Sequence, residues 1–389
     1  MPFAAALSTN AKTLIALEEV CQEIQARIGD PPELAAVFFS PHHAEDINVA
    51  VEKIRQGLQP RCLIGCMGES IIGNDKEIEE KPALSLWAGK WNQPVQVDPF
   101  HLVLERTPDG FSLMGWPDSL VNADPKHSGL LLLGEPSSFP IDFFLKQVND
   151  SNQGLRVCGG MASGSGGQAS CPLVLNERIL DHGAVGVVLS GPTIRCIVSQ
   201  GCRPIGRPMV ITKAQENLIY ELGGKTPLVQ LQELWPELGE RDQKLFQQGL
   251  HIGRVINEYQ AEFQRGDFLV RNVLGLERSS GALGLNDLVR VGQTVQFHVR
   301  DAESADEDLH ALLQLDLQAH DKPPSGVLAF TCNGRGTRLF PERHHDARVI
   351  REETGAIPLA GFFAQGELGP VGGQNFIHGF TASLALFED

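Results

Sequence analysis

Two glycine-rich turns near the C-terminus carry the side chains best suited to binding chemistry. The segment FTCNGRG (330–336) places Cys332, Asn333, Arg335 and Gly336 after an apolar run. The segment GELGPVGG (366–373) begins with Gly366 and Glu367. Turn amides and an arginine fork suit a carboxylate or phosphate, and a glutamate suits an ammonium group. We therefore predict a ligand site in which an Arg335–Glu367 pair joins the two turns. The alternative is two structural turns with solvated side chains.

Cys332 also permits a nucleophilic role, because a nearby arginine and turn amides favour a thiolate. The nearest histidines are His344 and His345, and no protease-type signature surrounds them. A small buried thiol is the commoner role of a cytosolic cysteine. We therefore expect no catalytic residue, and keep a thiol-dependent hydrolase or transferase that uses Cys332 as the alternative.

The other candidate ligand-binding residues follow similar strand ends. His378 precedes the last strand, and Gly65 and Cys66 lie in LIGCMGES (63–70). Gly160 and Ser163 lie in CGGMASGSGG (158–167), whose amides and hydroxyls suit an anion. This stretch lacks both the GxxxxGK[ST] of a P-loop and a correctly placed GxGxxG. Nucleotide binding is therefore not expected.

Hydrophobic periodicity predicts the elements that position these turns. Helices are expected at 11–28 and 43–57, and each precedes an apolar strand, at 34–39 and 61–66. This order predicts a parallel β-α-β unit. Closely spaced strands follow, with hairpins predicted at Gly191–Pro192 and within 208–224. Ser304 and Glu307 form a capping-box pattern before a helix, and late strands are expected at 326–332, 357–364 and 379–387.

We therefore predict a mixed α/β fold of layered, largely antiparallel or mixed sheets covered by helices. Two modules of similar size are expected, at residues 1–225 and 226–389. No clean internal repeat is visible. A weak indication of duplication comes from LIGCMGES and LAFTCNGRG, which are both strands that run into a turn containing glycine.

Composition limits the partners. The formal net charge is −16, and no run of Lys or Arg exceeds two residues, so neither nucleic acid nor a membrane is an expected partner. The N-terminus lacks a secretory signal, and the apolar runs are too short to span a bilayer. We therefore expect a cytoplasmic protein with reduced thiols. The eight cysteines and twelve histidines show no zinc or haem-attachment spacing. No metal and no cofactor are expected, although haem held by one histidine remains an alternative.

Together with VQFHVRDAESADEDL (295–309), the strand-end segments resemble the FIST family, named for F-box and intracellular signal transduction proteins. The resemblance implies an input module that binds a small ligand, such as an amino acid or a related organic acid. Some bacterial relatives are haem-binding gas sensors. The two modules use almost every residue, which implies a stand-alone sensor that signals through a separate protein. The family often has a polar pair after the histidine, where this chain has Gly379 and Phe380.

Overall fold

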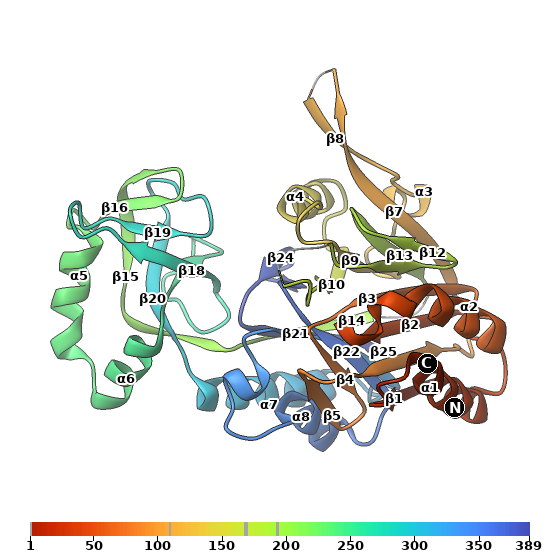
Figure 1. The fold of residues 1–389 in the computed structure, drawn as a ribbon. Coiled ribbons are helices and arrows are strands. Elements are labelled where there is room, and N and C mark those ends of the chain that lie inside the picture. Colours follow the sequence, from red (N-terminus) through yellow and green to blue (C-terminus); the bar gives the residue numbers. More distant parts are fainter. Residues whose placement is uncertain (1, 109, 167–169, 192–193) are drawn as a thin grey trace. The chain divides into compact units, whose positions relative to one another are not determined.

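The computed structural model describes residues 2–108, 110–166, 170–191 and 194–389, which form two compact units (Figure 1). The sheet unit comprises Met1–Val198, Leu309–Ile377 and Thr381–Asp389. The barrel unit comprises Ser199–Asp308 and His378–Phe380, and it spans the module boundary expected at 225 and 226.

The mixed α/β class is confirmed, since three sheets build the sheet unit and a closed barrel builds the other. The first sheet runs β1 (Phe3–Ser8), β6 (Leu84–Gly89), β2 (Leu34–Phe39), β3 (Cys62–Met67), β11 (Leu173–Leu175), β12 (Arg178–Leu180). The second runs β24 (Gln374–His378), β23 (Glu367–Val371), β10 (Arg156–Met161), β9 (Ser128–Gly134), β13 (Ala184–Ser190), β7 (Gln96–Thr107), β8 (Gly110–Met114). The third runs β14 (Ile194–Gln200), β25 (Thr381–Phe387), β21 (Gly326–Cys332), β22 (Leu359–Ala364), β4 (Ser70–Gly73), β5 (Lys76–Glu79).

The barrel runs β15 (Cys202–Gln215), β16 (Leu218–Leu222), β19 (Leu283–Leu285), β18 (Phe268–Leu276), β17 (Leu250–Val255), β20 (Thr294–Arg300). The helices are α1 (Thr13–Ile28), α2 (Ile47–Leu58), α3 (Asp118–Val121), α4 (Ile141–Ser151), α5 (Pro227–Leu234), α6 (Glu240–Gln248), α7 (Ala302–Ala319) and α8 (His345–Thr354). Short 3-10 turns occur at Pro41–Asp46, Trp235–Glu237 and Gly336–Arg338.

Each sheet of the sheet unit is built around a parallel β-α-β unit. The three units are β2-α2-β3, β9-α4-β10 and β21-α8-β22, and the first confirms the unit predicted from the sequence. After each unit the chain forms a hairpin on a different sheet: β4–β5 beside β22, β11–β12 beside β3, and β23–β24 beside β10. It then returns antiparallel to its own first strand, as β6, β13 or β25. The sheet unit therefore contains three repeats, at residues 34–89, 128–190 and 326–387, that exchange hairpins in a cycle.

One glycine recurs at the same place in the second parallel strand of each repeat. A Cβ atom there would lie only 1.9 to 2.2 Å from a carbonyl oxygen of the first parallel strand, so no larger residue fits. Each glycine and the residue paired with it are Gly65 with Val37, Gly159 with Leu132, and Gly361 with Ala329. The repeat is therefore visible in the structure although none is clear in the sequence. The two segments that hinted at duplication, LIGCMGES and LAFTCNGRG, belong to non-equivalent strands, β3 and β21.

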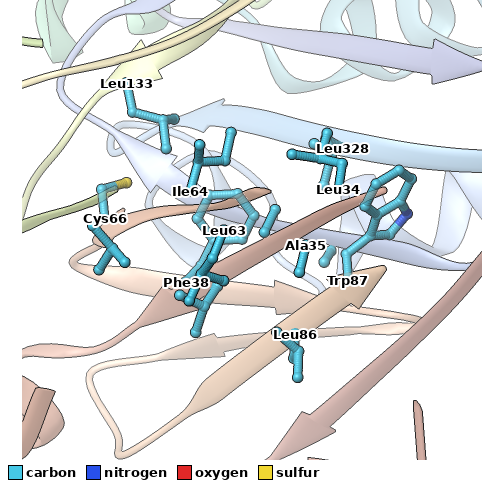
Figure 2. Packing of buried hydrophobic residues seen from close by; sticks show 14 of the residues in the cluster. Leu34, Ala35, Phe38, Leu63, Ile64, Cys66, Leu86, Trp87, Leu133 and Leu328 are labelled. Atoms are coloured by element: carbon cyan, nitrogen blue, oxygen red, sulfur yellow. The ribbon is translucent and has the colours of Figure 1, made fainter. Parts of the chain in front are cut away.

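The three repeats share a hydrophobic core (Figure 2). Phe38 and Ile64 from the first repeat, Leu133 from the second and Leu328 from the third all belong to this one cluster. The Phe38 ring stacks on Phe362 at 5.2 Å between centroids. Burial of this shared apolar surface is the main term that holds the repeats together.

Some local predictions need correction. Pro192 lies outside the described residues, and β13 and β14 on either side of it belong to different sheets, whereas the β15–β16 hairpin within 208–224 is confirmed. Helix α7 begins at Ala302, so Ser304 lies inside it and donates a hydrogen bond to Asp301 Oδ2 at 3.3 Å. Cys158 and Cys196 form a disulfide, against the expectation of reduced thiols. In the described parts of the chain, no helix has both the length and the apolar character needed to cross a membrane.

Candidate functional site

A pocket of about 710 Å³ lies in the sheet unit where the parallel strands of the three repeats end. Loops after β3, β9, β10, β21 and β22 supply its lining, which is the edge where α/β sheets usually bind ligands. The polar lining residues are Glu69, Glu135, Ser137, Ser165, Ser170, Asn333 and Gln365.

The connections that follow β3, β10 and β22 are tied to one another beside this pocket. The Ser163 amide donates to the Met67 carbonyl at 3.1 Å, and the Gln365 amide donates to Met161 at 3.0 Å. The Ser163 hydroxyl accepts from the Glu69 amide at 2.8 Å and donates to a carbonyl of β22. The predicted site residue Ser163 is therefore fully buried and holds the loops together rather than lining the pocket.

Glu135 is a carboxylate fixed at the pocket wall. Its Oε2 accepts hydrogen bonds from the Ser137 amide at 3.0 Å, the Ser137 hydroxyl at 2.6 Å and the Ser138 hydroxyl at 2.7 Å. Burial alone would raise its pKa, but these bonds and one from the Cys171 amide lower the pKa of Glu135 instead. The pocket therefore holds a stable negative charge.

Arg338 links two lining residues at the pocket rim. Its guanidinium pairs with Glu69 Oε1 and donates to the Asn333 carbonyl at 3.0 Å. The Asn333 side chain, predicted as a ligand contact, lines the pocket, and its Oδ1 is buried with no hydrogen-bond partner among the described residues. An unpaired buried acceptor costs about 1–3 kcal/mol, which a donor on a ligand would recover.

Arg335 does not form the ion pair with Glu367 that the sequence analysis favoured. Its fully buried guanidinium makes a bidentate pair with Asp346 of α8, at 2.8 Å and 2.7 Å, and lies over the Phe340 ring. Although burial favours the neutral acid, the Arg335 charge and a hydrogen bond from His345 hold the pKa of Asp346 below its usual range. Arg335 thus serves a buried network instead of an open anion clamp.

Three backbone amides of the FTCNGRG turn donate hydrogen bonds to other atoms of the protein. The Asn333 amide donates to Ala364, the Arg335 amide to the Cys332 carbonyl, and the Gly334 amide to Cys332 Sγ at 3.4 Å. Gly336 is buried with a φ of 57°, and a Cβ atom there would meet neighbouring side chains within 3 Å. The anion nest considered from sequence is therefore not formed by these three amides.

Glu367 is fully buried at the start of β23. Its Oε2 accepts from the Thr381 amide at 3.1 Å and the Thr381 hydroxyl at 2.7 Å. Burial raises the pKa of Glu367 to about 8, against the opposing effects of Thr381, the Cys332 thiol and the Arg335 charge. Glu77 is a second such group, because burial and the Asp346 charge raise its pKa to about 8. Two carboxyl groups near Arg335 thus favour the protonated form at neutral pH.

The remaining predicted residues are not brought into the pocket lining. Gly65 and Cys66 lie inside β3, and burial raises the pKa of Cys66 well above its usual value. Gly160 lies inside β10, paired with Glu367. Gly366 has a φ of 137°, and its carbonyl accepts from the Met161 amide at 2.8 Å. His378 is buried at the end of β24 and groups with the barrel unit.

Sequence reasoning missed the lining residues Glu135, Ser137 and Gln365, and Arg338, which pairs with the lining residue Glu69. The segment LLLLGEPSS (130–138) has the same pattern of a strand followed by a turn that identified the other segments, so this pattern could also have identified Glu135. Within the described residues, no three His, Cys, Asp or Glu side chains are placed to hold a metal ion.

Comparison with known proteins identifies the family. The FIST N domain model matches residues 33–225, and the FIST C domain model matches residues 228–370. An uncharacterized protein of Mycobacterium tuberculosis is 40% identical, over 93% of this chain and 92% of its own length. An uncharacterized protein of Mycobacterium bovis is 38% identical, over 96% and 95% respectively. The chain therefore belongs to the FIST family, whose domains are associated with sensing in signal transduction.

Proposed function

We propose that this chain is a cytoplasmic sensor that binds a small amino acid or a related amine in the pocket at the strand ends. The observation that carries the proposal is the pocket itself, which is formed by loops from all three repeats and offers Asn333 Oδ1, an acceptor with no partner among the described residues. Glu69 and Glu135 favour an ammonium group there, and Arg338 at the rim favours a carboxylate. An organic acid without an amino group would face two carboxylates.

Signalling would follow from the way the loops are tied together. Ser163 joins the connections after β3, β10 and β22, so a ligand that orders one loop would bias the others. A separate protein would read the altered surface, and no catalytic residue is needed for this role.

The test is a thermal-shift and calorimetric screen of amino acids, each compared with the matching amine and the matching carboxylic acid. A ligand at one hundred times its Kd raises stability by about 2.7 kcal/mol. We expect amino acids to bind, amines to bind more weakly, and acids to bind least. A screen without any shift would contradict the proposal.

Variants locate the site. Asn333→Ala and Glu135→Gln should each weaken binding by roughly tenfold or more, because each removes one polar contact. Arg348→Gln is the matched control for Arg338→Gln, since both arginines are similarly exposed, at 44% and 47%, and each pairs with a glutamate. Only Arg338→Gln should weaken binding, and equal losses in both variants would remove the pocket assignment.

A further inference from the structure

Cys332 occupies a position at which each repeat has a polar side chain or a thiol that accepts a hydrogen bond from a backbone amide. Counting three residues beyond the partner of the recurring glycine gives Ser40, Glu135 and Cys332. Ser40 closes its own repeat, because its hydroxyl accepts from the Ala83 amide at 3.0 Å. Glu135 anchors a loop of the ligand pocket. Cys332 is partly exposed, and its sulfur accepts the Gly334 amide at 3.4 Å, an interaction that favours a thiolate.

Glu367, whose carboxyl the Cys332 thiol hydrogen-bonds, is an unusual residue at its position in the fold. Glu367 pairs across from Gly160, one residue beyond the recurring glycine of β10. The same position in the other two hairpins is held by Ile71 and Leu173. The architecture therefore accepts an aliphatic side chain here, and a fully buried carboxyl is not required for folding. Burying a carboxyl costs free energy of folding, so an acid at a position that is aliphatic in the other repeats indicates a functional role.

The two oxygens of the Glu367 carboxyl have different surroundings. Thr381 binds only Oε2, while Oε1 is buried and receives no backbone or hydroxyl donor among the described residues. The Cys332 thiol is the other hydrogen-bonding group that acts on the carboxyl. Arg335 Nη1 is also buried and has no hydrogen bond within the described part of the chain, and the Arg335 charge acts on both Cys332 and Glu367. A negative charge shared between sulfur and carboxyl would be stabilised there.

We propose that Cys332 and Glu367 form a nucleophile–base pair that reacts with a small carbon electrophile. Above about pH 8, where Glu367 is ionised, its carboxylate takes the thiol proton, and the Cys332 sulfur forms a bond to the electrophilic carbon as the leaving group departs with its electron pair. With iodoacetamide the products are S-carbamidomethyl Cys332, iodide and protonated Glu367. This activity goes beyond ligand sensing, and it uses residues outside the pocket lining.

The test measures the rate of alkylation of the native protein by iodoacetamide, with each cysteine resolved by peptide mass spectrometry. Cys21 is the internal control, because it is partly exposed like Cys332 while burial raises its pKa to about 11. We expect Cys332 to react at least tenfold faster than Cys21. In Glu367→Gln, which keeps an acceptor for Thr381, Cys332 should slow at least tenfold while Cys21 is unchanged.

Each outcome decides the proposal. Similar rates at Cys332 and Cys21 in the wild-type protein would overturn it, and so would a Cys332 rate that Glu367→Gln leaves unchanged. If Glu367→Gln does not fold, as judged by circular dichroism, the wild-type rate ratio decides alone. A further variant, Glu367→Asp, keeps the carboxyl and should recover part of the rate, whereas a purely structural role for Glu367 predicts no such rescue. Amino-acid binding is measured separately, so failure here does not affect the sensor proposal.

Discussion

The first and third repeats place different side chains on the same backbone position. Ile71 in the first repeat pairs one residue beyond the recurring glycine, and Glu367 occupies that place in the hairpin of the third repeat. Both are fully buried. The fold therefore fixes the backbone and the burial, while the side chain is free to be aliphatic or acidic. Shared architecture and local chemistry can thus be separated by comparing repeats.

The strongest test of the repeat comparison is Gly361→Ala. A Cβ atom at Gly361 would lie 1.9 Å from the Ala329 carbonyl, so the parallel strands β21 and β22 would have to separate. We expect a loss on the order of 4 kcal/mol or more, seen by urea unfolding or as failure to fold. Gly57→Ala in α2 is the control, because space is open there and alanine should stabilise by roughly 0.5–1 kcal/mol. Similar effects of the two changes would reject the close-approach argument.

The next test asks whether the buried Arg335–Asp346 pair affects stability through its charges or through the space that its side chains fill. Arg335→Met leaves Asp346 buried without its main partner, which should cost about 3–5 kcal/mol. The double variant Arg335→Met with Asp346→Leu should recover much of that loss, because no unpaired charge remains. Urea unfolding of the two variants at pH 7 gives both values. A double variant that is less stable than Arg335→Met would show that the pair itself stabilises the fold.

A smaller effect depends on pH and addresses Glu367 directly. Its pKa is raised from 4.5 to about 8, so the protonated acid stabilises the fold at low pH and that contribution is lost as pH rises from about 4.5 through 8. Between pH 5 and pH 9, the free energy of unfolding of Glu367→Gln should therefore rise relative to that of the wild type by on the order of 1–3 kcal/mol. Thermal unfolding across this range measures the difference.

The control for this pH test is Glu45→Gln, which replaces an exposed carboxyl. Glu77 keeps its own raised pKa in every variant, so some pH dependence should persist in Glu367→Gln. Asp346 does not contribute in this window, because its lowered pKa keeps it ionised throughout. Parallel pH profiles for the wild type and Glu367→Gln would contradict the assignment.

The smallest expected effect concerns the hairpin turns. Asn74 and Asn176 adopt φ of 53° and 54° in the first and second hairpin turns, and the third turn uses Gly372 and Gly373. Asn74→Ala should cost about 1 kcal/mol, since alanine tolerates this backbone conformation poorly. Asn74→Gly should be close to neutral in urea unfolding. Equal losses in the two variants would point instead to the Asn74 side-chain bond to the Ala5 carbonyl at 3.4 Å.

The sequence was informative where the pattern is local. Helices α1 and α2 and strands β2 and β3 follow from hydrophobic periodicity, and the ordered strand-end segments pointed to the family. The three repeats escaped detection because their common feature is a close backbone approach at Gly65, Gly159 and Gly361, which leaves little common sequence around it. The partner of Arg335 was also not predicted, because the contact with Asp346 depends on where helix α8 packs and not on a local sequence pattern.

The cyclic exchange of hairpins has a consequence for each repeat taken alone. A polypeptide holding a single repeat would present an open strand edge and carry a hairpin with no sheet to join. Both needs are met at once when three copies assemble head to tail in a closed ring. One repeat alone would therefore need two further copies to complete its sheets, and this chain supplies all three in one polypeptide. Each repeat can then carry its own side chains at equivalent backbone positions.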